Sequence, residues 1–354
     1  MADRLKKIRD RIDALDDRIL KLFNSRARLA QRVARLKNGA VYRPEREAQV
    51  LRRLQYRNAG PLSGHAVARL FSEIMSACRA LQDALAVAYL GPRGTFSEEA
   101  VLKHFGGLTA AVPCSSIDEV FREVETGAVG YGVVPVENST EGAVGRTLDL
   151  LLATPLKICG EVMLPVHQCL MNKSGGRAEV RRIYSHTQSL AQCHEWLNQH
   201  HPKAERVAVV SNAEAARLAG LDRRAAAVAG RTAAERYGLA IIARNIEDDP
   251  KNTTRFLVLA THDAAPSGAD KTSRIMSART VPGAMHDLLT PLAKYQVSMT
   301  RLESRPSRTG LWEYVFYVDV EGHQRDANLA KALAELERRA SFLKDLGSYP
   351  AAVM

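Results

Sequence analysis

Residues 86–97 read AVAYLGPRGTFS, a five-residue apolar run followed by a loop rich in glycine and hydroxyl side chains. The same order of apolar run and polar loop occurs four more times, at YGVVPV before 137–142, RRIY before 185–188, VAVV before 211–214 and AAAVAG before 231–232. Strands that alternate with helices predict a mainly parallel sheet whose ligands bind where the strands end. The five loops therefore predict an α/β domain with a cleft suited to anions at helix N-termini.

Two familiar kinds of ligand pattern are absent from this segment. The loop at 91–96, GPRGTF, matches neither the dinucleotide-binding pattern nor the ATP-binding pattern. The pairs Cys193-His194 and His200-His201 lack the spacing of metal ligands. We therefore expect no nucleotide, no metal and no other cofactor.

A helical pattern precedes the α/β segment. Residues 4–37 contain no glycine or proline, and most of their apolar residues are spaced three or four apart. These residues are Leu5, Ile8, Ile12, Leu15, Ile19, Leu22, Leu29, Val33 and Leu36. The pattern predicts a helix about 50 Å long, which exceeds the core of a small domain, so we expect it to pack against helices of a second chain. Two shorter helices should follow, one beginning near Pro44 and one capped by Ser63.

Positive charge is concentrated in this helical segment. Residues 1–86 carry 19 Lys and Arg against 9 Asp and Glu, whereas the rest of the chain carries 31 against 30. Arg26 occupies a position within the apolar pattern, and Lys37 lies 11 residues further on, on nearly the same helix face. A lone arginine there would be a side chain that reaches out to solvent. Several inward-facing cations with few aromatic residues instead favour a small acidic ligand over a nucleic acid.

Three stretches of this segment resemble the all-helical chorismate mutases. They are IRDRIDALD at 8–16, YRPERE at 42–47 and IMSACRALQ at 74–82, and the resemblance covers nearly all of residues 1–86. The family implies an all-α, three-helix domain in which the helices of two chains interlock. Cys78 stands where the family often has serine, so no ligand contact is assigned to it.

The resemblance also implies which residues bind and rearrange chorismate. They are Arg9, Arg26, Lys37, Arg46, Glu47 and Gln82, with Arg9 supplied by the partner chain. Guanidinium groups would bind the two carboxylates of chorismate. Lys37 and Gln82 would donate hydrogen bonds to the ether oxygen, where charge grows in the transition state, and Glu47 would accept one from the ring hydroxyl.

Four motifs in the α/β segment closely resemble prephenate dehydratase. They are GPRGTFSEEA at 91–100, PVENSTEG at 135–142, SHTQ at 185–188 and NTTRF at 252–256. The resemblance spans about residues 87–262 and implies two α/β lobes, like those of periplasmic binding proteins, with the site in the cleft between them. Thr187 replaces the proline that is usual in the third motif, which should alter the turn more than the chemistry.

Prephenate must lose CO₂ and a ring hydroxyl, so its enzyme mainly needs a proton donor and anchors for two carboxylates. By resemblance, Thr254 donates or orients that proton, although a threonine hydroxyl titrates far from neutral pH and the true acid stays open. The residues expected to bind substrate are Thr95, Ser97, Glu137, Asn138, Ser185, Gln192 and Arg255.

The C-terminal part is predicted to be a small α+β domain. Residues 263–271, DAAPSGADK, have the composition of a linker, and a strand, a helix, two strands and a helix should follow. Three stretches resemble the amino-acid-binding ACT domain: Gly283, Ala284, Met285 and His286; Glu303, Ser304, Arg305 and Pro306; and Trp312, Glu313 and Tyr314. The resemblance implies a phenylalanine pocket between paired domains, to which the first two stretches are assigned. Taken alone, the second stretch would be a turn that ends a strand. If residues 263–271 form a linker, a chain truncated after Asp263 should keep dehydratase activity, and phenylalanine should no longer inhibit it.

The chain as a whole resembles the bifunctional chorismate mutase–prephenate dehydratases of phenylalanine biosynthesis. We expect a mutase domain at 1–86, a dehydratase domain at 87–263 and a regulatory ACT domain at 272–354, in a homodimer or a tetramer. Its ligands would be chorismate, prephenate and the effector L-phenylalanine. No apolar run suits a membrane span or a secretory signal, so we expect a cytoplasmic protein without membrane or nucleic-acid partners. The alternative is an amino-acid-responsive solute-binding module with an inactive mutase-like domain, which would need no proton donor at Thr254.

Overall fold

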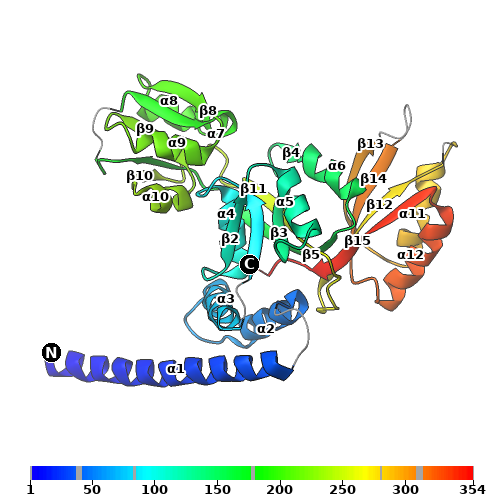
Figure 1. Cartoon of the computed structure of the whole chain (residues 1–354), viewed down its shortest axis with the longest axis horizontal. Helices are drawn as coiled ribbons and strands as arrows, with labels where there is room; N and C mark the ends of the chain where they lie inside the picture. The colour runs from blue at the N-terminus through cyan, green and yellow to red at the C-terminus, as the bar shows by residue number, and fades with distance from the viewer. Residues whose placement is uncertain are drawn as a thin grey trace.

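The computed structural model describes residues 2–36, 42–82, 85–176, 180–279, 281–307 and 314–353. The chain forms three helices, then two α/β lobes, then an α+β sandwich (Figure 1). In Figure 1 the second lobe, the first lobe and the sandwich follow one another in a row, and the three helices lie beneath the first lobe. Within the described part of the chain, no helix combines the length and the apolar character that crossing a membrane requires.

The helical part consists of α1 (Ala2–Leu36), α2 (Pro44–Arg57) and α3 (Gly64–Ala80). The Ser63 hydroxyl caps α3 as expected, because it accepts a hydrogen bond from the N–H of Ala66 at 3.1 Å. Helices α2 and α3 pack together around a small core that includes Leu51, Ala68 and Met75. Helix α1 buries none of its residues, and its N-terminal half extends beyond the other two helices (Figure 1).

The first lobe is built on a sheet with the strand order β2-β1-β3-β11-β5, to which the short strand β4 adds beside β3. Its strands are β1 (Ala86–Leu90), β2 (Ala110–Cys114), β3 (Tyr131–Asn138), β4 (Gly142–Ala143), β5 (Lys157–Pro165) and β11 (Thr253–Ala260). Its helices are α4 (Phe96–Phe105), α5 (Ile117–Glu125) and α6 (Gly145–Ala153). Strand β1 is parallel to β2 and β3, whereas β11 is antiparallel to β3 and β5.

The second lobe has the strand order β10-β6-β9-β7-β8. Its strands are β6 (Cys169–Asn172), β7 (Arg182–His186), β8 (Glu205–Val209), β9 (Ala225–Ala229) and β10 (Ala240–Arg244). Its helices are α7 (Thr187–Gln192), α8 (His194–His200), α9 (Asn212–Ala219) and α10 (Arg231–Tyr237). The two lobes agree with the two-lobed domain that the resemblance implied. Each sheet is mixed instead of mainly parallel, because β11 runs antiparallel to β3 and β5 in the first lobe, and β6 runs antiparallel to β9 and β10 in the second.

The C-terminal sandwich has the strand order β13-β14-β12-β15, and its strands are all antiparallel. Its elements are β12 (Asp270–Ser277), α11 (Ala284–Lys294), β13 (Met299–Pro306), β14 (Tyr314–Glu321), α12 (Ala327–Arg339) and β15 (Phe342–Pro350). The two helices pack on one face of the sheet through Leu288, Leu292 and Leu336. Strand β15 was not predicted, because FLKDLGSYP mixes charged, glycine and apolar residues without a clear alternation.

The sandwich and the first lobe share one hydrophobic core. Leu148 and Leu257 of the lobe belong to the same cluster as Tyr317, Leu346 and Tyr349 of the sandwich, and all five are buried. Strand β15 lies so close to β5 that a Cβ on Gly347 would stand 2.6 Å from the carbonyl oxygen of Ile158. The sandwich is therefore a packed part of the molecule.

The segment that was predicted to be a linker is also held in place. Arg52 of α2 donates hydrogen bonds to the Ser267 hydroxyl at 2.9 Å and to the carbonyl oxygens of Ala269 and Ala351, each at 2.8 Å. Ser267 and Asp270 are buried and hydrogen bonded to each other at 2.5 Å. The linker prediction is therefore wrong for 267–271, where one arginine of the helical part ties the segment to the C-terminal tail.

Candidate active sites

A cavity of about 430 Å³ lies between α1, α2 and α3. It brings together four of the six residues predicted to act on chorismate, which are Arg26, Arg46, Glu47 and Gln82. Three arginines that the sequence analysis did not assign also line it, namely Arg43, Arg53 and Arg79. Its size suits a small molecule. Five guanidinium groups around the Glu47 carboxylate make it a site for a ligand with more than one negative charge.

Two of the predicted side chains converge on Cys78 at the wall of this cavity. Arg26 Nη1 donates to Cys78 Sγ at 2.9 Å, and Gln82 Nε2 donates to the Cys78 carbonyl oxygen at 3.2 Å. A thiol sulfur is a weak acceptor, so the carboxylate of a ligand would readily displace it from the Arg26 guanidinium.

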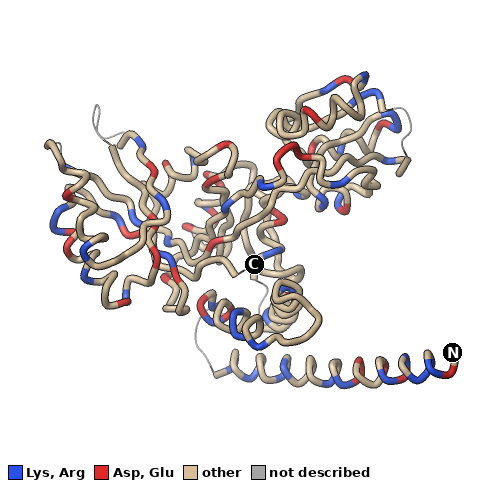
Figure 2. Tube along the Cα trace, turned by 180° about the vertical axis from the view of Figure 1, so that it is seen from behind, with Lys and Arg blue, Asp and Glu red and all other residues tan. Residues whose placement is uncertain are grey.

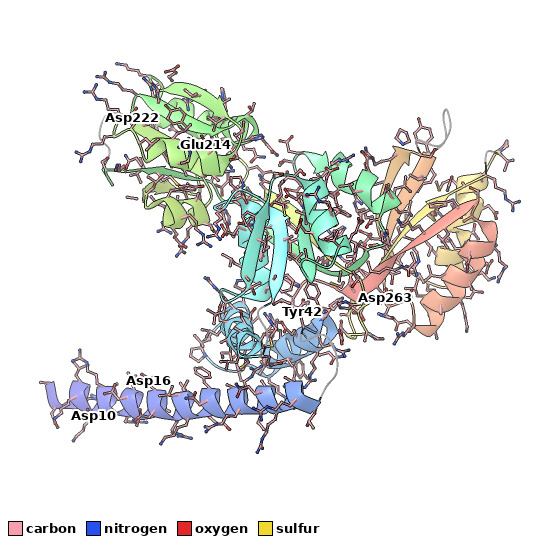
Figure 3. The ribbon with its side chains drawn as sticks, in the orientation of Figure 1. Asp10, Asp16, Tyr42, Glu214, Asp222 and Asp263 are labelled. Carbon is pink, nitrogen blue, oxygen red and sulfur yellow. The ribbon has the colours of Figure 1, made fainter. Side chains whose placement is uncertain are left out.

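The other two predicted residues are not part of this cavity. Arg9 lies on the exposed N-terminal half of α1, about 25 Å along the helix from Arg26, and cannot reach the cavity of its own chain. Lys37 lies outside the described residues. Figure 3 shows the side chains of α1, including Asp10 and Asp16, projecting from a helix that the rest of the chain leaves uncovered there. Lys and Arg residues are distributed along its whole length (Figure 2).

Glu47 is held by a buried arginine that the sequence analysis missed. Arg79 of α3 forms an ion pair with Glu47 and donates a second hydrogen bond to the carbonyl oxygen of Phe105. Burial raises the pKa of Glu47, and the nearby Arg79 guanidinium opposes that rise. Phe105 is the last residue of α4, so Arg79 joins the cavity of the helical part to the first α/β lobe.

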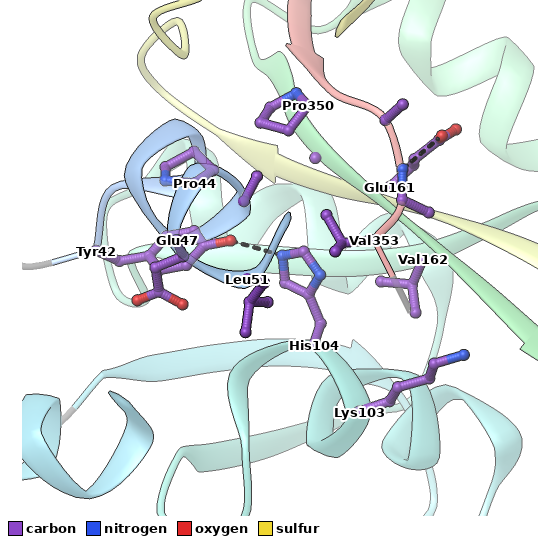
Figure 4. A pocket seen from close by; sticks show the side chains of 14 residues that line it. Tyr42, Pro44, Glu47, Leu51, Lys103, His104, Glu161, Val162, Pro350 and Val353 are labelled. Atoms are coloured by element: carbon purple, nitrogen blue, oxygen red, sulfur yellow. Dashed lines mark hydrogen bonds between the residues drawn. The ribbon is translucent and has the colours of Figure 1, made fainter. Parts of the chain in front are cut away.

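A second cavity of about 50 Å³ lies at the junction of the three parts (Figure 4). It is lined by Tyr42 and Glu47, by His104 and Glu161 of the first lobe, and by the C-terminal residues 350–353. The Tyr42 hydroxyl lies 2.6 Å from His104 Nε2, and burial lowers the pKa of His104 to about 3, so the ring is neutral. The cavity is too small for a substrate, and we interpret it as part of the packing between the domains.

The second candidate site forms where β11 pairs with β3, with Thr254 opposite Asn138. Asn138 Nδ2 donates to Thr254 Oγ1 and to Asn252 Oδ1, each at 2.8 Å, and Asn252 Nδ2 donates to Gln192 Oε1 at 2.9 Å. Gln192 ends α7 of the second lobe, so the hydrogen bonds join both lobes. The structure thus gathers three predicted residues, Asn138, Gln192 and Thr254, and adds Asn252, which the sequence analysis did not assign.

The direction of these hydrogen bonds matters for proton donation. Because the Thr254 oxygen accepts from the Asn138 amide, the hydroxyl proton of Thr254 can point elsewhere. Asn138 Oδ1 is fixed in turn by the loop that follows it, since it accepts from the hydroxyl of Thr140 at 2.6 Å and from the backbone N–H of Glu141 at 3.1 Å. The side chain that orients Thr254 is therefore itself held in one orientation.

Two predicted substrate-binding hydroxyls have hydrogen-bond partners within the protein, and a third is buried. Ser185 is fully buried and donates to the carbonyl oxygen of Val228 at 2.7 Å. The Thr95 hydroxyl caps α4 by accepting from the N–H of Glu98 at 3.4 Å. Ser97 is buried in the first turn of the same helix. They belong to the N-terminus of α4 and to the end of β7.

Two predictions about substrate contacts require correction. Arg255 is buried and its guanidinium donates to Glu161 at 2.9 Å, to Asp319 at 2.6 Å and to the Tyr349 hydroxyl at 3.0 Å. Neighbouring residues of a strand point to opposite faces, so Arg255 faces the sandwich whereas Thr254 faces the other way. Glu137 likewise accepts a hydrogen bond from Arg301 of β13 at 2.9 Å. Both side chains contact the sandwich instead of the Asn138–Thr254 pair.

The predicted phenylalanine-binding stretches lie at two places in the sandwich. Gly283 is the N-cap of α11 in the left-handed conformation, with φ 80°, and Ala284, Met285 and His286 form the first turn of the helix. Glu303, Ser304, Arg305 and Pro306 form the end of β13, which is an edge strand of the sheet. Arg305 donates to Asp149 of α6 at 3.1 Å, so this side chain also faces the first lobe.

Family models match all three parts of the chain. The model of chorismate mutase type II matches residues 8–83, that of prephenate dehydratase matches residues 87–264, and that of the ACT domain matches residues 274–338. The chain is therefore a multidomain enzyme that joins a mutase domain, a dehydratase domain and an ACT domain.

Relatives that match nearly the full length of the chain show which family it belongs to. The bifunctional chorismate mutase/prephenate dehydratase of Neisseria gonorrhoeae is 54% identical over 98% of this chain and 97% of its own length. That of Aquifex aeolicus is 43% identical over 99% of each chain. The chain belongs to the bifunctional chorismate mutase/prephenate dehydratase family.

Two solved structures resemble about three quarters of the chain. The prephenate dehydratase of Arthrobacter aurescens in complex with L-Phe is 33% identical with a TM-score of 0.68, over 75% of this chain and 90% of that one. GqqA, described as a novel type of quorum quenching acylase, is 32% identical with a TM-score of 0.70, over 76% of this chain and 98% of that one. One fold thus carries differently described activities, so the assignment depends on the full-length relatives and on the sites.

Proposed function

We propose that the helical cavity converts chorismate to prephenate and that the Asn138–Thr254 site converts prephenate to phenylpyruvate. The observation that carries this proposal is the presence in one chain of two separate sites of the required chemistry. One is a cavity lined by five arginines with Glu47 and Gln82, and the other is a threonine hydroxyl oriented by Asn138. Membership of the bifunctional family supports the same pairing.

The mutase step needs no covalent catalysis. Its barrier falls when the substrate is held in a compact conformer and when charge on the breaking C–O bond is stabilised. Arg26 and Arg46 would bind carboxylates, Gln82 and Lys37 would donate to the ether oxygen, and Glu47 would accept from the ring hydroxyl. Within this cavity the Glu47 and Arg79 side chains are only 17% and 6% exposed, which strengthens the electrostatic contact between them.

We further propose that the mutase site is completed by a second copy of this chain. Helix α1 carries large apolar residues that are 43 to 86% exposed, with no residue of the helix buried, and these include the predicted apolar pattern. Pairing of two such helices would cover these side chains and would bring Arg9 of one chain to the cavity of the other. A homodimer is the smallest assembly that does this, and a tetramer would join two such dimers.

The dehydratase step would use Thr254 as the group that donates a proton to the departing hydroxyl. The C–O bond breaks as CO₂ leaves, the electrons of the C–CO₂ bond enter the ring, and the hydroxyl departs as water. Formation of the aromatic ring drives the reaction, so the protein contributes mainly orientation and one proton. The Asn138–Thr254 hydrogen bond provides that orientation, and the contacts through Asn252 to Gln192 align the two lobes.

Regulation by L-phenylalanine is proposed for the ACT domain. The dehydratase from Arthrobacter aurescens was solved in complex with L-Phe, which supports this choice of effector. We assign the binding region to the α11 N-terminus at 283–286 and to the end of β13 at 303–306. The described cysteines are all free and buried, which agrees with the reducing cytoplasm that we propose as the location.

Turnover of the unmodified protein tests the function directly. Supplied with chorismate alone, it should release phenylpyruvate, and supplied with prephenate it should do so without the mutase step. A solute-binding module would bind prephenate, as calorimetry can show, and return it unchanged. Release of prephenate without phenylpyruvate would reject the dehydratase assignment, and turnover of prephenate but not chorismate would reject the mutase assignment.

A further inference from the structure

Four charged residues alternate in sign across the contact between the first lobe and the sandwich. Glu137 of β3 lies opposite Arg255 of β11 in one sheet, and Arg301 of β13 lies opposite Asp319 of β14 in the other. Arg301 Nε donates to Glu137 Oε2 at 2.9 Å, and Arg255 Nη1 donates to Asp319 Oδ2 at 2.6 Å. These four residues form a charge quartet with one member on each of four strands.

Strand β13 makes a second ion pair with the same lobe. Arg305 lies four residues after Arg301 and therefore on the same face of the strand, and its Nη2 donates to Asp149 Oδ1 at 3.1 Å. Asp149 belongs to α6, which runs beside β13 (Figure 1). A Cβ on Gly145, the first residue of α6, would lie 2.9 Å from Arg305 Nη1, so this glycine leaves the space that the guanidinium occupies.

The two arginines hold both ends of the segment that carries Asn138. Glu137 directly precedes Asn138, and α6, which contains Asp149, begins directly after residues 139–144, which include the short strand β4. Arg255 of the quartet directly follows Thr254. The two residues joined by the 2.8 Å hydrogen bond of the dehydratase site are thus each next to a residue that is paired with the sandwich.

We propose that Arg301 and Arg305 of the ACT domain are positioning residues of the dehydratase site. They hold the loop of Asn138 against Thr254, and an amino acid bound at the end of β13 changes dehydration through them. The inference rests on the proposed dehydratase function, and it adds the sandwich residues on which that site depends. An error of about 1 Å in such an arrangement is enough to lower a rate on the order of a hundredfold.

The arrangement also has unused hydrogen-bonding capacity. Arg301 Nη2 and Arg305 Nε are buried and lack a hydrogen-bond partner among the described residues. A buried donor without a partner raises the free energy of the arrangement that contains it. A different placement of β13 could satisfy these donors, so the strand has a physical reason to exist in more than one position. An effector that binds one position more tightly shifts the population towards it.

The first test replaces Arg301 by Gln and by Lys and measures turnover of prephenate and of chorismate by the full-length protein. Arg301→Gln should lower the dehydratase kcat about tenfold with little change in KM, and Arg301→Lys should retain most of the rate because it keeps the charge. Mutase turnover should stay unchanged. Arg339→Gln is the control, because Arg339 is an ion-paired arginine of the same sandwich whose partners, Asp287 and Glu335, lie inside the sandwich. Its dehydratase rate should match the unmodified protein.

A double-mutant cycle separates positioning from mere structural support. If Arg301 acts through Glu137, Arg301→Gln should have little further effect on kcat in a Glu137→Gln background. Losses of kcat that simply add would overturn the proposal. So would an Arg301→Gln protein that melts at a lower temperature but keeps its kcat per folded molecule. If the unmodified protein does not turn over prephenate at all, the proposed function fails instead.

The effector gives the last measurement. In the Arg301→Gln variant, which leaves the proposed effector region at 283–286 and 303–306 unchanged, calorimetry should still detect phenylalanine binding. Phenylalanine should, however, change the remaining dehydratase rate far less than in the unmodified protein. Retained binding with lost inhibition is the result expected if Arg301 carries the coupling. Undiminished inhibition in this variant would overturn that part of the proposal. Loss of both binding and inhibition would also overturn it, because Arg301 would then serve the effector pocket alone.

Discussion

Arg79, in the last turn of α3, forms a buried ion pair with Glu47, in the first turn of α2. The two side chains are only 6% and 17% exposed, and the same guanidinium donates to the carbonyl oxygen of Phe105 in the dehydratase domain. A carboxylate removed from water stays ionised only with a compensating partner. The acid of the mutase cavity therefore depends on an arginine that is anchored to the neighbouring domain.

Arg79→Met should change the pH dependence of the mutase. Burial raises the pKa of Glu47 and Arg79 opposes the rise, so loss of the guanidinium raises this pKa further. If the ionised carboxylate accepts the ring hydroxyl, the acid limb of the profile of kcat/KM moves to higher pH. We expect a loss of about tenfold at neutral pH that shrinks as the pH rises. Mutase assays with chorismate across the acid and neutral range measure the shift.

Two controls accompany this variant. Arg57→Met removes a charge from the exposed end of α2, outside the cavity, and should leave the profile in place. Dehydratase turnover of added prephenate by the Arg79→Met protein reports whether the rest of the chain is intact. A folded Arg79→Met protein with an unshifted mutase profile would show that Glu47 does not act in its ionised form.

Thr254→Ala should remove dehydration and spare the mutase. Loss of a positioned proton donor typically lowers a rate between a hundredfold and ten-thousandfold, and we expect at least about a hundredfold here. Thr254→Ser keeps a hydroxyl beside Asn138 and should retain part of the rate. Separate assays with prephenate and chorismate measure both activities. An alanine variant with an unchanged dehydratase rate would show that another group donates the proton. Glu137 would then be the next residue to test, although its carboxylate accepts a hydrogen bond from Arg301.

The site residues that the structure brings together are those that belong to recognisable sequence motifs. Arg26, Glu47 and Gln82 meet in one cavity, and Asn138 and Thr254 meet across two strands, although 116 residues separate them. These residues were assigned from the resemblance of short local motifs to the two enzyme families, and each motif keeps its residues within one helix or one strand end. The assignment of the chain to three kinds of domain was confirmed by the family models.

The errors concern residues whose roles depend on contacts between domains. Arg255 follows Thr254 in a strand, so alternation alone could have placed it on the opposite face from the proton donor. Arg79 follows Cys78 in an apolar helix, and a cation there was a signal of the kind that drew attention to Arg26. No comparable signal pointed to the hydrogen bond from Arg79 to Phe105, or to those from Arg52 to Ser267 and Ala351. Each of these hydrogen bonds joins segments that are far apart in the sequence, and nothing local to either segment encodes it.

Truncation after Asp263 should damage the dehydratase, contrary to what the sequence predicted. The cut removes Tyr317, Leu346 and Tyr349 from the shared core and leaves Arg255 without Asp319. Each large apolar side chain lost from such a core is worth about 1.5 to 3 kcal/mol, so the remaining lobe loses much of its stability. Thermal unfolding and prephenate turnover of the truncated chain check this. A truncated protein with the melting temperature and rate of the full chain would show that the two parts fold independently.

Ile12→Asp should separate the subunits and abolish the mutase while sparing the dehydratase. Ile12 is 51% exposed on α1, and in the proposed dimer a carboxylate there would be buried among apolar residues without a partner. Because Arg9 would come from the other chain, a monomer lacks one of its cations and should lose mutase turnover by about a hundredfold or more. Sedimentation measures the assembly, and the two assays measure the activities.

Ala14→Asp is the control, because it adds the same charge about 200° around the helix, and it should preserve both the dimer and the mutase activity. An Ile12→Asp protein that stays dimeric, or a monomer that keeps full mutase turnover, would contradict the shared site.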